Sequence, residues 1–212
     1  MAIAKKKKKF FDVEMSIINR DTQLQAMNIS ELEGREIKYD LTRILKGKSI
    51  LMNFKVKVKD DKAISIPKEI KLMPYYLRRM VRKGTDYVED SFVVECKDAE
   101  MHVKPFIITR RKVSRAVKNA VRKNAKEELI NYFKTKTSEE IFEEILRNRL
   151  QKTLSMKLKK IYPLSLCEIR SLKIMKEIET KKEAKEPKEA KKEEKAPEED
   201  KKEETKEDSQ KE

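Results

Sequence analysis

Few side chains of the types used in catalysis stand where they could act together. The chain has one histidine, His102, and two cysteines, Cys96 and Cys167, which form no Cys-x-x-Cys pair. Without a second histidine or a nearby cysteine, local sequence cannot complete a metal site or a nucleophile pair. Adjacent carboxylates such as Glu139 and Glu140 lie among basic residues, which favours solvated ion pairs. We predict a protein that is not an enzyme and needs no metal or cofactor, with both thiols buried and free.

The segment Gly47-Lys48-Ser49 matches the end of a phosphate-binding loop. That loop requires another glycine five residues earlier, where the backbone curls around the phosphates, and this chain has Thr42 there. The segment also precedes a strand-like pattern, whereas the motif opens a helix. We predict that it does not bind a nucleotide.

Basic side chains form patterns better suited to nucleic acid. Arginines and lysines recur every three or four residues from Arg111 to Lys126, on the helix face opposite Val113, Val117 and Val121. Such a helix can bury its apolar side and present a row of cations to successive phosphates, which arginine forks fit well. The residues predicted to bind RNA are Lys5, Lys6, Lys7, Lys8, Lys9, Arg35, Arg78, Arg79, Arg82, Lys83, Arg110, Arg111, Lys112, Arg115, Lys118, Arg122, Lys126, Lys159, Lys160, Arg170 and Lys173.

Two tyrosines, Tyr75 and Tyr76, stand beside the basic cluster 78–83. A tyrosine next to arginines can stack on an unpaired base, but it can also pack in the core. We favour core packing for them.

The positive charge is concentrated outside the C-terminal segment. Lys and Arg total 53 against 38 Asp and Glu, a net charge of +15, while residues 181–212 carry 11 lysines and 13 acidic residues. A compact body with this excess repels itself unless it binds a polyanion, so nucleic acid is favoured over an anionic membrane. No apolar run approaches the ~18 residues of a transmembrane helix, and no secretory signal is recognisable. We expect a cytoplasmic protein.

Alternating polarity predicts strands in the first half of the chain. A strand is expected over 50–58, followed by a turn at 60–61 and a partner strand that Pro67 ends. A second hairpin is expected from 92–94 and 103–109.

Helical periodicity dominates the second half. Pro74 opens and Gly84 closes a short helix over 75–83, and longer helices are expected over 113–133 and 141–158, the latter introduced by a capping box at 137–140. A final strand is expected over 166–174. This order predicts an α+β fold with an antiparallel, barrel-like β-sheet flanked by helices.

Three regions are expected along the chain. Residues 1–29 form a basic N-terminal arm and extension, 30–176 an α+β RNA-binding domain, and 177–212 a disordered tail of Lys, Glu, Ala and Pro. The tail has almost nothing apolar to bury, so nothing offsets the entropic cost of ordering it.

Four segments, in order and in register, resemble a small-subunit ribosomal protein family of archaea and eukaryotes, S-one-e, also called S-three-A-e. The family's Leu-Arg-Ser-Leu-Val-Arg-Arg-Gly-Thr pattern is similar to residues 77–85. The other segments are 33–35 with 40–41, 103–109, and 160–164 with 168–170 and Lys173. The resemblance covers residues 30–175 and looks archaeal.

This resemblance implies a barrel-like sheet lodged in small-subunit rRNA on the platform, near where mRNA leaves. The implied partners are rRNA and neighbouring ribosomal proteins, with mRNA near the exit as a further candidate, and neither a membrane nor a small-molecule substrate. A chromatin-type DNA-binding protein is the alternative, suggested by the basic arm and the Lys/Ala/Glu/Pro tail. An RNA-processing enzyme is a third class, which lacks an acid–base or metal constellation.

Overall fold

The computed structural model describes residues 7–45, 47–59 and 62–177. The chain divides into two units, Met1–Ile178 and Glu179–Glu212, and every described residue belongs to the first. Lys5, Lys6, the expected turn at 60–61 and nearly all of the expected tail lie outside the described residues.

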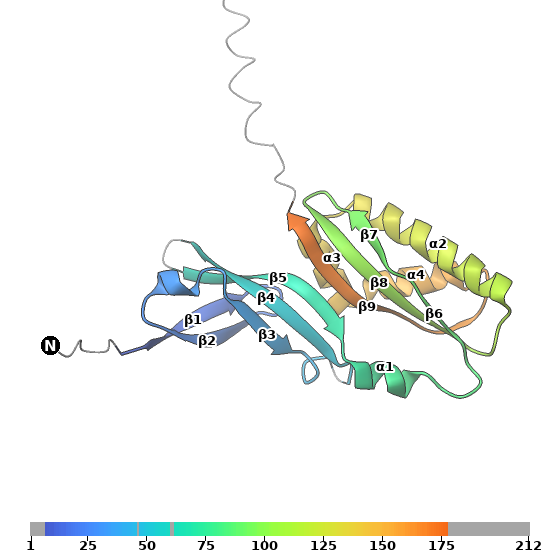
Figure 1. The fold of residues 1–212 in the computed structure, drawn as a ribbon, viewed down its shortest axis with the longest axis horizontal. Coiled ribbons are helices and arrows are strands. Elements are labelled where there is room, and N and C mark those ends of the chain that lie inside the picture. Colours follow the sequence, from blue (N-terminus) through green and yellow to red (C-terminus); the bar gives the residue numbers. More distant parts are fainter. Residues whose placement is uncertain (1–6, 46, 60–61, 178–212) are drawn as a thin grey trace, which may run out of the picture. The chain divides into compact units, whose positions relative to one another are not determined.

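The predicted strands and helices occur in the predicted order, together with four strands that were not predicted, three within the first 40 residues and one at 87–89 (Figure 1). The first half contains β1 (Lys9–Met15), β2 (Arg20–Ala26), a 3-10 helix (Ile29–Leu32), β3 (Glu36–Asp40), β4 (Ile50–Lys59), β5 (Lys62–Leu72) and α1 (Pro74–Met80). The second half contains β6 (Tyr87–Glu89), β7 (Phe92–Glu95), β8 (Ala99–Thr109), α2 (Arg115–Lys134), α3 (Ser138–Leu146), α4 (Arg149–Leu158) and β9 (Leu164–Glu177).

The fold is α+β, and its sheet is open. The strands pair in the order β2-β1-β5-β9-β8-β6, with β3 on β4, β4 on β5, and β7 on β8. Both β5 and β8 pair with two different strands along one edge, so the sheet branches there. Among the described strands, the outer ones, β2 and β3, do not pair with β6 or β7, so the expected barrel is not confirmed.

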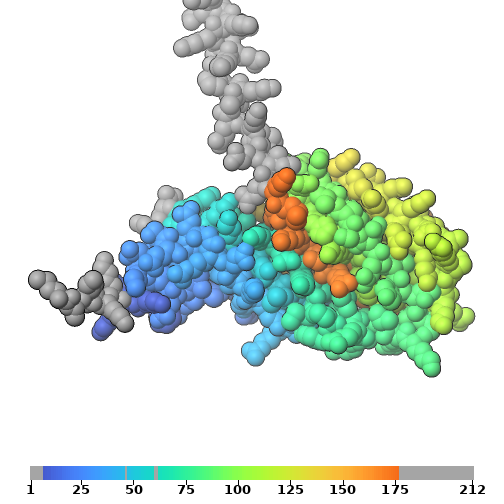
Figure 2. Space-filling view, viewed as in Figure 1, coloured from blue at the N-terminus to red at the C-terminus, as the bar shows by residue number. Residues whose placement is uncertain are grey.

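The helices cover one face of the second half of the sheet. The apolar face of α2 buries Val121, Ala125, Leu129 and Phe133, and α4 packs on β9. The opposite face of β8 and β9 reaches the surface, where Figure 2 shows β9 in orange beside β8 in green. Helical spacing of apolar residues therefore predicted correctly which side of α2 is buried.

Strand β5 continues through Pro67, which corrects the expectation that the strand ends there. Along one edge, β5 pairs with β1 at residues 63–64 and with β9 at 69–71, so the ladder is interrupted at Pro67. Along the other edge, the register with β4 shifts between Asn53 and Phe54, opposite the proline. A proline is tolerated at such a position because its missing N–H would lack a regular partner there.

Two helices also depart from the predicted boundaries. Helix α1 ends at Met80 because Val81 turns to extended backbone, and Gly84, with φ +88°, then redirects the chain. The helix expected over 141–158 is two helices, because Asn148 takes a left-handed conformation with φ 57°. Asparagine tolerates this region better than most residues. The predicted capping box at Thr137 and Glu140 is present at the start of α3.

The N-terminal segment joins the sheet from Lys9 onward. Strands β1 and β2 form an antiparallel hairpin, and β1 runs parallel to β5 at Val13 and Glu14. Val13 and Met15 are buried in the core. This region was expected to be an arm and extension, and no strand was predicted there.

Both cysteines are free and buried, as predicted. Burial raises the pKa of the Cys96 and Cys167 thiols to about 12, so the reactive thiolate is scarce at neutral pH.

Candidate nucleic-acid interface

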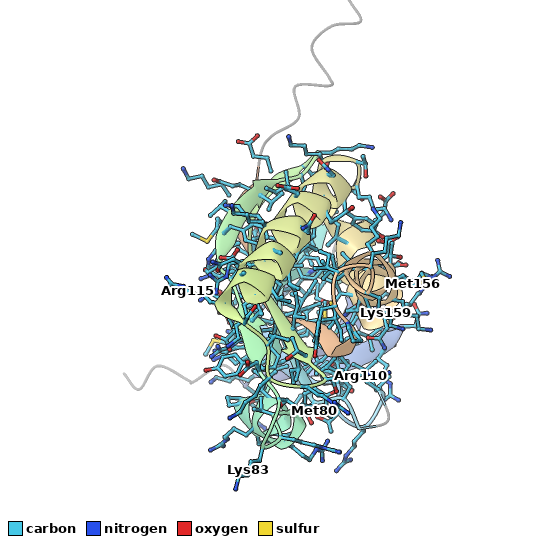
Figure 3. The ribbon with its side chains drawn as sticks, turned by 90° about the vertical axis from the view of Figure 1, so that its right-hand side faces the viewer. Met80, Lys83, Arg110, Arg115, Met156 and Lys159 are labelled. Atoms are coloured by element: carbon cyan, nitrogen blue, oxygen red, sulfur yellow. The ribbon has the colours of Figure 1, made fainter. Side chains whose placement is uncertain are left out.

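Three loops from distant parts of the sequence meet at one end of the first unit. They are residues 81–86 after α1, 110–114 between β8 and α2, and 158–163 after α4. Figure 3 views this end, with Lys83, Arg110, Arg115 and Lys159 spread around it. The three loops carry seven cations and one carboxylate. We call these cations the basic end: Arg82, Lys83, Arg110, Arg111, Lys112, Lys159 and Lys160, all of them exposed.

Hydrogen bonds at the end of β8 hold the three loops together. The Thr109 amide donates to the Asp86 carbonyl at 2.9 Å, and the Thr109 hydroxyl donates to the same oxygen at 2.9 Å. The Arg110 amide donates to the Pro163 carbonyl at 3.4 Å. The loops are thus joined through backbone atoms and the Thr109 hydroxyl, which leaves the basic side chains free to face solvent.

The single carboxylate of the three loops, Asp86, fixes the start of α2. It accepts a hydrogen bond from the Val113 amide at 3.0 Å and forms an ion pair with Lys118 at 3.0 Å. The Val113 hydrogen bond, followed by the Lys118 contacts, lowers the pKa of Asp86. Asp86 is therefore used mainly inside the framework, although the charge of Lys112 in the basic end also helps to lower its pKa.

Replacing Asp86 with asparagine tests this framework role. Because the folded state lowers the Asp86 pKa, the charged form stabilises the fold above the ordinary aspartate pKa of about 3.9, and this contribution is lost as the pH falls through the lower folded-state pKa. In urea titrations, D86N should unfold earlier than the wild type at pH 7, and the difference should shrink below about pH 4. A difference that stays constant from pH 7 to pH 2 would contradict the role of the charge.

Only part of the predicted row of cations from Arg111 to Lys126, which we call the stripe, is free to bind RNA. Arg111 precedes the helix, because α2 begins at Arg115. Lys118 is paired with Asp86, and the Lys126 ammonium lies 5.6 Å from the centre of the Phe92 ring. Arg115 and Arg122 are exposed and form no ion pair with any described residue. The stripe therefore extends the basic end mainly through these two arginines.

The cluster on α1 divides between structural and exposed side chains. The Arg79 guanidinium lies 5.7 Å from the Tyr76 ring centre and donates to the Gly47 carbonyl at 3.4 Å. Tyr76 is buried, as favoured, but Tyr75 is exposed. Arg78 is exposed on the helix, whereas Arg82 and Lys83 lie beyond its end.

The remaining predicted residues lie on other elements. Lys7, Lys8 and Lys9 are exposed at and before β1, and Arg35 donates to the Gln25 carbonyl at 2.9 Å. Arg170 and Lys173 lie on β9, where Arg170 binds both oxygens of Glu89 at 3.1 Å. The predicted set is therefore divided among several surfaces.

A buried polar cluster went unnoticed in the sequence. The Lys48 ammonium lies 2.6 Å from a Glu168 carboxylate oxygen and donates to the Asn148 side chain at 2.6 Å. Only 9% of Lys48 and 8% of Glu168 is exposed. Burial, and then the Glu168 charge, raise the pKa of Tyr76. The Gly-Lys-Ser segment leads into β4, as predicted, and its lysine is occupied by this ion pair.

The described residues offer little for metal chemistry. No group of three or more His, Cys, Asp or Glu side chains among them is placed to hold a metal ion. His102 contacts the Ser91 hydroxyl through Nε2 at 2.8 Å. In the part of the chain that the structure describes, no helix combines the length and apolar character needed to cross a membrane.

Comparison with known proteins confirms the resemblance found in the sequence. The sequence model of the Ribosomal S3Ae family matches residues 4–178, so the chain belongs to this family. A similar relative is the small ribosomal subunit protein eS1 of Pyrobaculum arsenaticum, 30% identical over 140 residues, which are 65% of this chain and 64% of that protein.

Two further archaeal relatives carry the same name. The protein of Methanothermobacter thermautotrophicus is 33% identical over 103 residues, 48% of this chain and 53% of its own length. That of Nanoarchaeum equitans is 26% identical over 167 residues, 74% of this chain and 84% of its own length. The chain thus spans between half and two thirds of the length of the first two relatives.

Proposed function

We propose that the chain is a structural constituent of the small ribosomal subunit and that its basic end binds small-subunit rRNA. The observation that carries this proposal is the convergence of seven exposed cations from three loops whose one carboxylate is already paired. Phosphate contacts dominate affinity for nucleic acid, and a rigidly held group of cations neutralises several phosphates together. The names of the archaeal relatives support the ribosomal assignment.

The location within the subunit is a finer part of the same proposal. The family resemblance supports a place on the platform near the mRNA exit, beside neighbouring ribosomal proteins. In this setting the protein would stabilise local rRNA geometry and perform no catalysis. Its cytoplasmic location would follow from that of the ribosome.

Sedimentation of an archaeal extract that expresses a tagged chain tests the proposal. The tagged protein should comigrate with small subunits in a sucrose gradient. The variant R111Q/R115Q/R122Q should shift to the top of the gradient, because the loss of about three phosphate contacts weakens binding by about 500-fold at 0.1 M salt.

A matched control removes three exposed lysines elsewhere, in K97Q/K134Q/K152Q, and should comigrate like the wild type. Both variants should melt within a few degrees of the wild type, because exposed substitutions rarely change stability by more than about 0.5 kcal/mol. Comigration with nucleoid DNA and absence from ribosomal particles would overturn the proposal in favour of a chromatin-type protein.

A further inference from the structure

The face of the sheet that the helices leave open carries two rows of polar residues across three strands. In one row, Glu69 of β5 pairs with Lys173 of β9, which pairs with His102 of β8. In the next, Lys71 pairs with Ser171, which pairs with Lys104. Residues two apart on a strand share a face, so both rows point to the same side. We call this surface the open face: Glu69, Lys71, His102, Lys104, Ser171 and Lys173.

The open face lines a groove of about 810 Å³. Arg170 also lines it, because a register shift between β8 and β9 at residues 104–105 leaves Arg170 as the extra residue of a bulge. Bulges commonly re-aim a side chain in this way. The groove therefore collects cations from β5, β8 and β9.

Each carboxylate of this groove accepts a hydrogen bond, whereas three of its lysines make no side-chain hydrogen bond or ion pair within the described part of the chain. Glu69 accepts from the Asn53 amide at 2.9 Å, Glu89 pairs with Arg170, and Asp90 accepts from the Ser91 amide at 2.9 Å. The ammonium groups of Lys71, Lys104 and Lys173 form no hydrogen bond or ion pair with any described residue. The charge of Lys173 also helps to lower the pKa of Glu36. With Arg170, these lysines give the groove four cations against three carboxylates, and only one of those carboxylates, Glu89, is held in an ion pair with a described residue. The groove thus has a small positive excess and three ammonium groups that a ligand's phosphates can contact.

An exposed aromatic ring outside the groove lining lies on the same face of the sheet. Tyr87 lies two residues before Glu89 on β6, and therefore on the same face, and it is 54% exposed. Its ring stacks on Phe106, with ring centres 5.9 Å apart. A basic groove with an adjacent aromatic ring is the combination that binds single-stranded nucleic acid, because lysines follow the backbone and the ring stacks on a base.

We propose that the open face is a second RNA site, specific for single strands, in which Lys71, Lys104 and Lys173 contact successive phosphates and Tyr87 stacks on a base. This inference rests on the proposed function, because it assumes that the protein binds RNA. It assigns a different kind of RNA to a different surface: single strands on the open face and duplex on the basic end.

Titrations of the full chain with a fluorescent twelve-nucleotide oligouridine and with a twelve-base-pair RNA duplex test this assignment. In K71Q/K104Q/K173Q, the slope of log affinity against log salt for the oligouridine should fall by about 2, which corresponds to about 100-fold weaker binding at 0.1 M salt. Affinity for the duplex should change less than about threefold, because the basic end is intact.

The control K97Q/K134Q/K152Q has the same net charge and should bind both RNAs like the wild type. If both triple variants lose oligouridine affinity equally, the effect is one of net charge and the proposal is overturned. An equal loss of affinity for the duplex and for the single strand would also overturn it. So would a groove variant that binds both RNAs normally and loses affinity only for the acidic polypeptide polyglutamate. Wild-type protein that binds neither RNA would overturn the proposed function itself, whereas normal RNA binding by K71Q/K104Q/K173Q overturns only this inference.

Tyr87 provides an independent test because it carries no charge. Y87A should weaken oligouridine binding about tenfold without changing the salt slope, whereas Y87F should bind like the wild type because it keeps the stacking ring. If Y87A binds oligouridine as tightly as the wild type, Tyr87 is not part of the site.

Discussion

Replacing one cation in each loop of the basic end, in R82Q/R110Q/K159Q, is expected to weaken binding to duplex RNA about 500-fold at 0.1 M salt. Each phosphate contact contributes about 0.9 to the slope of log affinity against log salt, so three contacts contribute about 2.7. At 1 M salt, counterion release contributes nothing to binding. A slope that is lower by about 2.7 therefore means an affinity about 500-fold lower at 0.1 M salt. Fluorescence anisotropy from 0.1 to 0.5 M salt measures both quantities.

The three substituted residues are remote in sequence and close only in the fold. Single substitutions should each lower the slope by about 0.9, and the triple variant should lower it by their sum, because the phosphates contacted are different. K97Q/K134Q/K152Q should retain the wild-type slope. If the triple variant loses no more than the strongest single variant, the loops do not act as one surface.

Replacing Lys48 with methionine is expected to destabilise the fold by about 3–5 kcal/mol. The substitution leaves the Glu168 carboxylate buried without its cation, and an uncompensated buried charge is costly. For a domain of this size, such a loss lowers the melting temperature by roughly 10 °C. Thermal unfolding followed by circular dichroism at pH 7 measures the change.

The double variant K48M/E168L provides the control. Because it removes both charges, it should recover most of the lost stability, as buried ion pairs replaced by apolar residues often do. The pair joins the segment before β4 to β9, and Asn148 at the corner between α3 and α4 completes the cluster. A K48M protein within about 1 kcal/mol of the wild type would show that Glu168 finds another partner or is neutral.

Regular elements were predicted where one periodicity extends over many residues. The alternation of β4 and the helical spacing of α2 report burial directly, because a strand exposes every second residue and a helix one side. The α3–α4 corner was missed because the apolar spacing continues across it, and the left-handed Asn148 leaves no mark in that pattern. The hairpin of β1 and β2 was missed because lysines precede β1 and most residues of β2 are polar. Together these features suggested an extension without regular structure.

The candidate RNA-binding residues were chosen by residue type, because the sequence does not show which of them share a surface. Arginine and lysine clusters are visible along the chain, so Arg82, Lys83 and residues 110–112 were named as candidates. Lys71 and Lys104 were not named as candidates because neither has a basic residue next to it in the sequence, and only strand pairing brings them beside Lys173. Lys118 was assigned to RNA because no local pattern shows that Asp86, 32 residues earlier, pairs with it.

The sequence by itself determined the α+β class, the excess of positive charge outside the C-terminal segment, and membership of the ribosomal family. Each of these follows from local periodicity, composition or short motifs that the chain carries within a few residues. The tertiary structure alone decided which cations share a surface and which are occupied. That decision depends on pairing across the sheet and on hydrogen bonds such as those of Thr109 and Asp86, which join residues too distant along the chain for any local pattern to connect.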